Sequence, residues 1–244
     1  MTCFASIALA ENAPTIQIRT ISVAPYGIEA ENRNSGIYYD LANALADHLV
    51  SRKNIKVSHK IYPYARIIHE LKNGKTDLSI LFKYEELEQH VHYIAALPEL
   101  KNVVMGLNGQ AFNSVADLEG KTIAYLRGAT FSEEIDNNPK IIKITTNNFR
   151  QGIDMLMAER VDAIIGPIDP ILSAAQKLKI DKDLFGPALI VSTKTPWLQI
   201  SNLSKLRYSI DDIKKYFNEI LAAGKLNSLR EKYLTYEDNF NKTN

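Results

Sequence analysis

The chain has 244 residues, of which 45% are hydrophobic and 23% are charged, and its formal net charge is +1. This composition is typical of a globular protein with one large or two small domains. A net charge this small gives no electrostatic reason to expect nucleic acid or an anionic membrane as a partner. No segment approaches the roughly 18 consecutive apolar residues that a membrane-spanning helix needs.

The first ten residues are small and apolar and end in Ala8-Leu9-Ala10 before Glu11, a pattern typical of signal-peptide cleavage sites. A basic segment before the apolar stretch is missing, and an ordinary N-terminal extension is the alternative. We expect residues 1–10 to be a signal-peptide remnant, which suits an oxidising compartment. Cys3 is the only cysteine, so no intrachain disulfide can form.

The first part of the chain alternates strands with helices. Strands are predicted at 16–23, 55–61 and 78–82 from their apolar, β-branched composition. Between them lie a helix with apolar residues at helical spacing and a second helix that begins at Pro63 and ends at Gly74. This alternation predicts a mostly parallel sheet flanked by helices.

The alternation starts again after an extended apolar segment at 102–107. Further strands are predicted at 123–126, 141–144 and 161–165. The intervening helices begin near Phe131 and at a cap formed by Asn147 or Asn148, and Asp169-Pro170 is predicted to cap a third helix.

A second extended segment at 188–192 leads to a C-terminal helix that ends at Gly224. The pattern therefore predicts an α/β protein with a second lobe, 108–187, inserted into a first lobe formed by 11–107 and 188–235. Two crossing strands would form a hinge. Residues 236–244 form a polar tail, which we expect to be flexible.

A short phrase occurs once in each predicted lobe. LKNGKTDLSI at 71–80 and LMAERVDAII at 156–165 both read as the end of a helix, a turn and an Asp before an apolar strand. Asp77 and Asp162 are predicted to brace the turn or the strand start. Chance is the alternative, because helix–turn–strand units are common. Two similar lobes would leave a cleft suited to a small ligand.

Five segments, in this order, resemble the family 3 periplasmic solute-binding proteins that serve polar amino-acid ABC importers. They are SGIYYDLANALADHL, YPYARIIHELKNGKTDLSI, VADLEGKTIAYLRGATF, AERVDAIIG and AAGKLNSLREKYL. The resemblance covers nearly the whole chain after the signal-peptide remnant. It implies a two-lobe α/β fold, each lobe a mostly parallel sheet flanked by helices, that closes on a small ligand.

One candidate site is the loop of Arg127, Gly128, Ala129 and Thr130, between a strand and a helix start. Thr130 with Glu133 has capping-box spacing, and backbone N–H groups at a helix N-terminus suit an anion. In the family, the corresponding loop contacts the ligand carboxylate. An ordinary capped helix is the alternative.

A second set of candidates follows the strands of the first lobe. Arg66 could clamp a carboxylate with two parallel hydrogen bonds, or it could be a surface residue. Tyr26, Tyr64 and Phe82 lie at or just after strand ends, where open α/β sheets bind ligands, although core packing would also explain such rings.

Two positions depart from the resemblance. Leu87 and Pro167 stand where amino-acid binders of this family carry an Arg for the ligand carboxylate and an Asp for the ligand ammonium. Neither replacement can pair a charge, which argues against a standard α-amino acid held in the usual way. Lys83, Arg66 and Asp169 are the candidate replacements, with a helix cap as the alternative role of Asp169.

The sequence thus predicts a monomeric extracytoplasmic solute-binding protein. It would capture a small polar ligand, anionic or amino-acid-like, between its lobes and deliver it by hinge closure to an ABC importer. The alternatives are a ligand-sensing module without a permease and a dehydratase-like enzyme on the same fold. Because we find no nucleophile–base motif, P-loop or zinc motif, we expect neither catalysis nor a cofactor. His90 and His92 lack further ligands nearby, so we expect no metal.

Overall fold

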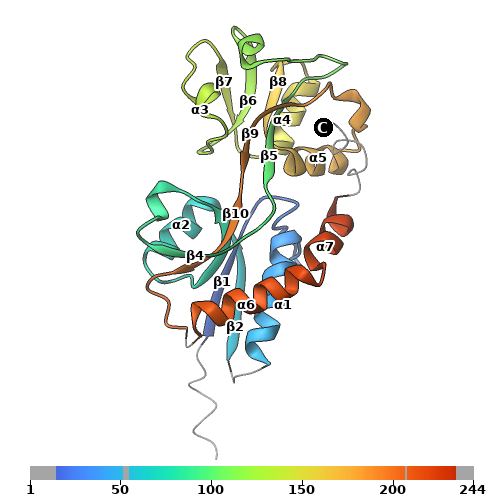
Figure 1. Ribbon diagram of the computed structural model, residues 1–244. Coiled ribbons are helices and arrows are strands. Elements are labelled where there is room, and N and C mark those ends of the chain that lie inside the picture. Colours follow the sequence, from blue (N-terminus) through green and yellow to red (C-terminus); the bar gives the residue numbers. More distant parts are fainter. Residues whose placement is uncertain (1–14, 52–54, 207, 235–244) are drawn as a thin grey trace, which may run out of the picture. The chain divides into compact units, whose positions relative to one another are not determined.

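The computed structural model describes residues 15–51, 55–206 and 208–234 (Figure 1). Its contacts divide the chain into two compact units. Of the described residues, the first unit holds those up to Ser22, Tyr26–Leu97 and Trp197–Leu229, and the second holds Val23–Pro25, Pro98–Pro196 and those from Arg230 on. Residues 1–10 with Cys3, and the predicted tail at 236–244, lie outside the described residues.

The first unit is built on a five-stranded sheet of order β2-β1-β3-β10-β4. Strand β1 is parallel to both β2 and β3, and β10 is antiparallel to β4. The bounds are β1 (Thr15–Ile21), β2 (Lys56–Tyr62), β3 (Leu78–Phe82), β4 (Val91–Ala96) and β10 (Pro196–Ser201).

Helices α1 (Ile37–Val50), α2 (Tyr64–Lys72) and α6 (Ile210–Ala222) pack in this unit, and a 3-10 turn follows β3 at Glu85–Leu87. Helix α1 buries one apolar face because Ile37, Leu41, Leu45 and Leu49 recur every four residues. Helix α2 ends before Gly74, whose φ of 64° suits the left-handed turn expected there. The last helix, α7 (Lys225–Tyr233), buries Leu226 and Leu229.

The second unit is built on a five-stranded sheet of order β7-β6-β8-β5-β9. Strand β6 is parallel to β7 and β8, whereas β5 is antiparallel to β8 and β9. The strands are β5 (Leu100–Met105), β6 (Thr122–Leu126), β7 (Ile142–Thr146), β8 (Ala163–Pro167) and β9 (Leu189–Lys194). The helices are α3 (Glu133–Asp136), α4 (Phe149–Met157) and α5 (Ile168–Lys177), with 3-10 turns at Val115–Leu118 and Lys182–Leu184.

The predicted α/β fold is confirmed, but the sheets are mixed rather than mostly parallel. Each has three parallel strands, and the segments predicted as crossings, 102–107 and 188–192, correspond to β5 and β9, which pair within the second sheet. Because these strands belong to the second unit, its main segment runs from Pro98 to Pro196 rather than from 108 to 187.

The repeated phrase has the same structure in both units. In the first, the Asp77 N–H donates to the Gln17 carbonyl (2.8 Å) and Asp77 Oδ2 accepts from the Gln17 N–H (2.7 Å). In the second, Asp162 makes the same two bonds with Thr122, at 2.8 and 2.7 Å. Each Asp thus joins the start of one strand to its parallel neighbour, which confirms the predicted bracing role.

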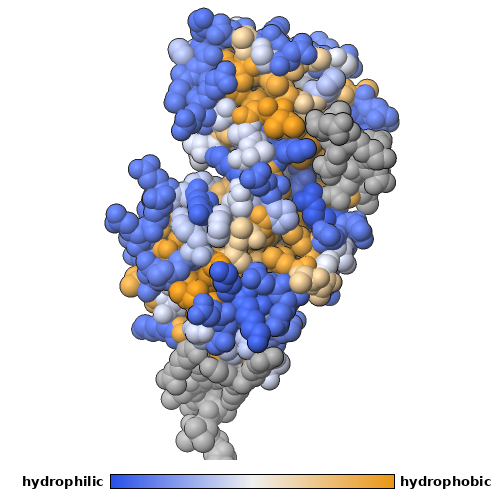
Figure 2. Space-filling model, viewed as in Figure 1, coloured by the Kyte–Doolittle hydropathy of each residue, from blue (hydrophilic) through white to orange (hydrophobic). Residues whose placement is uncertain are grey.

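Hydrophilic side chains cover much of the face shown in Figure 2, with apolar side chains visible between them. Some apolar residues of the edge strands are exposed, such as Ile142 in β7 (48%) and Ile190 in β9 (51%). Within the described ranges, no helix combines the length and the apolar character needed to cross a bilayer.

Candidate ligand-binding site

Aromatic side chains gather where the parallel strands of the first unit end. Tyr62 closes β2 and Phe82 closes β3, while Tyr64 and Tyr84 follow just after these strands. The rings of Tyr64 and Tyr84 are 4.8 Å apart, and those of Phe82 and Tyr84 are 6.5 Å apart. This carboxyl edge, where open α/β sheets bind ligands, therefore offers flat apolar surfaces.

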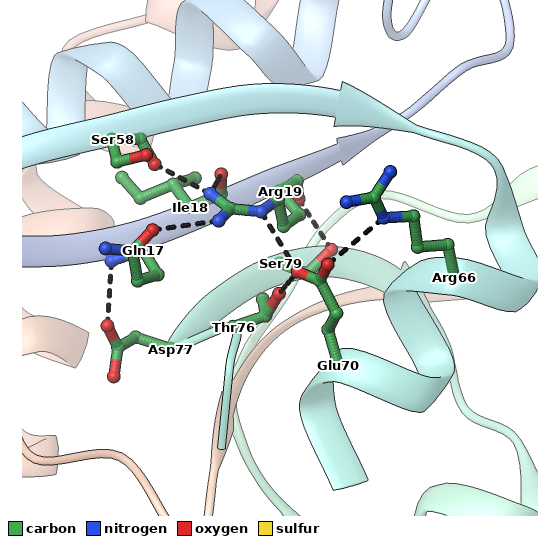
Figure 3. Close-up of polar contacts among 9 residues, drawn as sticks. All are labelled: Gln17, Ile18, Arg19, Ser58, Arg66, Glu70, Thr76, Asp77 and Ser79. Atoms are coloured by element: carbon green, nitrogen blue, oxygen red, sulfur yellow. Dashed lines mark hydrogen bonds and ion pairs between the residues drawn. The ribbon is translucent and has the colours of Figure 1, made fainter. Parts of the chain in front are cut away.

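Arg66 lies at the same edge, in the first turn of α2. Its Nε donates to Glu70 Oε1 at 3.1 Å, and its guanidinium carbon is 3.6 Å from the centre of the Tyr62 ring. The side chain is 55% exposed, and among the described residues only its Nε has a recorded hydrogen bond, the one to Glu70 (Figure 3). Arg66 is thus held in place through Nε, while no described residue is recorded as accepting from its two terminal nitrogens.

Glu70 is shared by two arginines. Its Oε2 accepts from the buried Arg19 Nε (3.1 Å) and from Thr76 Oγ1 (3.0 Å), while Oε1 accepts from Arg66 (Figure 3). Burial acts to raise the pKa of Glu70, but the hydrogen bonds from Thr76 and Arg66 and the charge and hydrogen bond of Arg19 outweigh it, so the pKa is lowered. One carboxylate between two guanidinium groups leaves the three residues with an excess positive charge.

Tyr64 lies beside this cluster but its hydroxyl is turned to an acidic residue. It donates to Glu86 Oε1 (3.4 Å), whose other oxygen pairs with Lys72 Nζ (2.8 Å). Burial, followed by the effects of Tyr84 and Glu86, raises the pKa of the Tyr64 hydroxyl. Tyr64 therefore stays a neutral hydrogen-bond donor.

Lys83 follows β3, but its ammonium lies near strands β10 and β4, whereas Tyr62 belongs to β2 on the opposite side of β3. Its Nζ is 4.1 Å from the centre of the Trp197 ring in β10 and 4.7 Å from that of Tyr93 in β4. Since β10 and β4 come after β3 in the order β2-β1-β3-β10-β4, the head group is drawn away from the β2 edge where Arg66 lies. The structure therefore does not bring Lys83 and Arg66 together.

Tyr26 is a core residue rather than an exposed one. Only 5% of it is accessible, its ring stacks on Tyr38 at 4.3 Å, and its carbonyl accepts from the N–H groups of Tyr38 and Tyr39. The packing explanation weighed for this ring accounts for all of these contacts.

The loop after β6 differs from the predicted capped helix. Helix α3 starts at Glu133 with Ser132 as its N-cap residue, so Thr130 does not cap it. The Arg127 N–H donates to the Thr146 carbonyl (2.9 Å) and the Ala129 N–H to the Leu126 carbonyl (3.1 Å). Two of the backbone donors expected for an anion are thus used inside the protein, and α3 is only four residues long.

Gly128 is required for backbone conformation rather than for space. Its φ is +73°, a left-handed value that favours glycine, and a Cβ built there would meet no atom within 4 Å. A side chain at this position would strain the turn without filling the loop.

Residues that the sequence reasoning missed hold this loop from two neighbouring strands. Lys194 Nζ in β9 donates to the carbonyl oxygen of Thr130 and, at 3.3 Å, to its hydroxyl. Asn102 Nδ2 in β5 donates to the Phe131 carbonyl (3.3 Å) and to Ser192 Oγ (2.9 Å), and the Ser192 hydroxyl donates to the same carbonyl. The only sequence signal was that Ser192 and Lys194 alternate along an extended segment and so share one face.

Asp169 is not the helix cap that was considered for it. Helix α5 begins one residue earlier, at Ile168, with Pro167 as its N-cap residue, so Asp169 lies inside the first turn. The side chain is buried, and Arg230 Nη1 lies 3.3 Å from Asp169 Oδ2. Its carboxylate thus serves an internal ion pair.

The two departing positions have structural roles. Leu87 is fully buried and packs in a cluster with Ile67, Ile68 and Leu71. Pro167 ends β8 opposite Asn102 of β5. Neither position offers a charged group to a ligand.

A separate hollow of about 590 Å³ lies in the second unit, lined by Leu107, Asn108, Gly109, Gln110, Leu156, Glu159, Val161 and Asp162. Asp162 directly precedes β8, so this hollow is at the amino ends of the parallel strands, opposite to the 127–130 loop. Among the described residues, no group of three His, Cys, Asp or Glu side chains is placed to hold a metal ion.

The family model of the bacterial extracellular solute-binding proteins, family 3, matches residues 18–236. The "Probable amino-acid-binding protein YxeM" of Bacillus subtilis (strain 168) is 22% identical over 216 residues, which cover 86% of this chain and 79% of that protein.

Solved structures show the same fold. An ancestral arginine-binding protein bound to arginine matches with a TM-score of 0.71 and 22% identity, covering 90% of this chain and 98% of that one. A histidine kinase sensor domain with similarity to periplasmic binding proteins matches with a TM-score of 0.74 and 14% identity, covering 91% and 96%. The fold, the order of the five resembling segments and the match over most of the chain agree: the chain belongs to the bacterial extracellular solute-binding proteins, family 3.

Proposed function

We propose that this protein captures a small anionic solute in the periplasm, holds it between its two lobes, and delivers it by hinge closure to an ABC importer as a monomer. Support comes from the family, whose members bind solutes outside the cytoplasm, and from an amino-acid-binding relative. Closure of this kind requires that the ligand bind the closed state more tightly than the open one.

The observation that carries the proposal is the state of Arg66. Its Nε is fixed by Glu70 and its plane lies against Tyr62, so little side-chain freedom is lost when the outer nitrogens bind a ligand. A guanidinium presented in this way matches the two oxygens of a carboxylate. The excess positive charge of Arg19, Arg66 and Glu70 favours an anion.

The ligand class follows from what surrounds this guanidinium. The rings of Tyr64 and Phe82 offer an apolar surface for the carbon skeleton of a small molecule. Leu87 and Pro167 supply no partner for the carboxylate and ammonium of an α-amino acid in the usual way, and Asp169 is paired with Arg230. The proposed ligand is therefore an organic acid, or an amino-acid-like molecule whose carboxylate is held by Arg66.

Substitution of Arg66 tests this assignment. A charge-assisted hydrogen bond contributes roughly 1.5–3 kcal/mol, so Arg66→Ala should weaken binding of a carboxylate ligand by about tenfold or more. Ligands would be found by thermal shift among amino acids and organic acids, and affinities measured by calorimetry. Arg150→Ala is a matched control, because Arg150 makes the same kind of contact to Asp154 four residues later in α4 (4.0 Å).

Equal affinity of the Arg66→Ala and Arg150→Ala variants for the acid would contradict the role of Arg66. Delivery would be tested separately, by uptake of the identified ligand through a candidate permease with and without the protein. Recovery of the ligand unchanged after long incubation would separate capture from catalysis.

A further inference from the structure

Lys194 lies at the carboxyl edge of the second sheet. Strand β5 runs antiparallel to β8 and places Asn102 opposite Pro167, the last residue of β8. Leu100, two residues earlier in β5, is therefore beyond the end of β8, and Lys194 is opposite Leu100. This is the edge from which the 127–130 loop leaves β6, and the edge where sheets of this kind bind ligands.

The ammonium of Lys194 is held by neutral atoms only. Two of its three hydrogens go to the carbonyl and the hydroxyl of Thr130, and among the described residues no acceptor is recorded for the third. Lys194 is partly buried and forms no ion pair within the described part of the chain. Burial lowers the pKa of Lys194, and the charge of Asp136 only partly opposes this effect.

Fixing a loop with a partly buried positive charge carries a desolvation cost that neutral side chains avoid. Asn102 and Ser192, which are neutral, already hold the next carbonyl, that of Phe131, from the same two strands. Desolvating a cation that forms no ion pair with a described residue opposes folding, so a lysine here needs a reason beyond the loop. Arg127, exposed in the same loop, likewise forms no ion pair with a described residue and adds to the positive potential.

We propose that Lys194 is the residue of the second unit that binds the acidic group of the ligand, with Thr130 holding its ammonium in position. The proposal rests on the function proposed above, and it deepens it by assigning to the ligand an acidic group that Lys194 binds. The sequence predicted that the backbone N–H groups of the 127–130 loop bind the anion. The proposal assigns this role to the side chain of Lys194 in β9 instead.

The test compares diacids with their matched diamides, which carry no carboxylate: succinate with succinamide, and glutarate with glutaramide. Calorimetry would be done on the wild type, Lys194→Met, Lys194→Arg and the control Lys101→Met, which alters a partly buried lysine of the neighbouring strand β5. We expect Lys194→Met to lose about tenfold or more in affinity for the acid but little for the amide, Lys194→Arg to keep most of the acid affinity, and Lys101→Met to match the wild type.

Equal losses for acid and amide would mean that Lys194 only positions the loop, and unchanged acid affinity would mean that it does not meet the ligand; either result overturns the proposal. A second arm measures thermal stabilisation by inorganic sulfate at constant ionic strength, for which the natural ligand need not be known. If no acid or amide binds the wild type but sulfate stabilises it and not Lys194→Met, the proposed function fails while the anion site stands. If sulfate also fails to distinguish the two proteins, the anion site is wrong as well.

Discussion

His59 in β2 is a neutral imidazole with both ring nitrogens engaged. Asn43 Oδ1 can only accept, so Nδ1 donates to it (2.7 Å) and Nε2 accepts from the Thr20 hydroxyl (2.8 Å). The ring also stacks on Tyr39 at 4.0 Å. Burial and the charge of Arg19 lower the pKa of His59 to about 3, against an opposing effect of Asp40.

This pKa predicts a pH dependence of stability. The unfolded chain protonates His59 near pH 6.5 and the folded protein only near pH 3, so the unfolded state binds more protons in between. The free energy of unfolding should therefore decrease as the pH falls from about 6.5 to about 3, by on the order of 2–4 kcal/mol from this residue.

Urea unfolding at neutral and acidic pH would measure this effect, with His59→Gln expected to lack it. His92→Gln, at an exposed position of β4, serves as the control. Glu70 and Asp162, whose pKa values are lowered, make all variants sensitive to acid. The effect of His59 is therefore the difference between the wild type and His59→Gln in the free energy of unfolding plotted against pH. Parallel curves for the wild type and His59→Gln would refute the assignment.

At the scale of elements, the two Asp residues join neighbouring strands. Burial acts to raise the pKa of Asp162, but hydrogen bonds from the N–H and hydroxyl of Thr122, together with the charge of Lys121, lower it. The carboxylate therefore stabilises the junction of β6 and β8 in its ionised form.

Asp162→Asn should reduce the free energy of unfolding by about 1–3 kcal/mol, because one charged acceptor of two hydrogen bonds is replaced by a neutral amide. Asp154→Asn, on the exposed face of α4, should change it by less than about 0.5 kcal/mol. Chemical denaturation of both variants checks the difference. An equal decrease in the free energy of unfolding of both variants would show that the contacts of Asp162 with Thr122 do not stabilise the fold.

The sequence predicted elements well where the pattern is local. The alternation of strands and helices, a cap at Asn147 or Asn148 and the stop at Gly74 all follow from neighbouring residues, and the structure contains each of them, with Asn148 as the cap. The capping box at Thr130 was wrong, because α3 begins at Glu133 with Ser132 as its N-cap residue. The Thr130 hydroxyl instead accepts from Lys194, 64 residues later. Strands β4 and β10 were not predicted; their sequences, VHYIAA and PWLQIS, mix apolar residues with His92 and Gln199.

At the scale of the molecule, the second unit uses nearly continuous sequence. Residues 98–196 contain all five strands of its sheet, helices α3, α4 and α5, and its buried core. The two-lobe arrangement and the order of the segments were predictable, since the repeat and the resemblance span the chain. The ligand-binding residue proposed in β9 was not, because only three-dimensional pairing brings it to the 127–130 loop.

A fragment of residues 98–196 should therefore fold alone, with far-UV and near-UV circular dichroism signals and a cooperative thermal transition. The remaining segments joined by a short linker test the first unit in the same way. A chain that ends at 196 should leave the first unit unfolded, because β10 and α6 are missing from it. An unfolded 98–196 fragment would contradict this division.

Strand β10 lies between β3 and β4, yet it is made more than a hundred residues after β3: Gln199 Nε2 donates to the Leu81 carbonyl across 118 positions. While the ribosome is still producing the intervening segment, β3 has an unsatisfied edge that can pair with another chain. Closing so long a loop is slow compared with local folding. Chaperones that cover this edge until the last strand has emerged would protect the nascent polypeptide. We therefore expect growth temperature and chaperone supply to govern the yield of folded protein more than the stability of its core does.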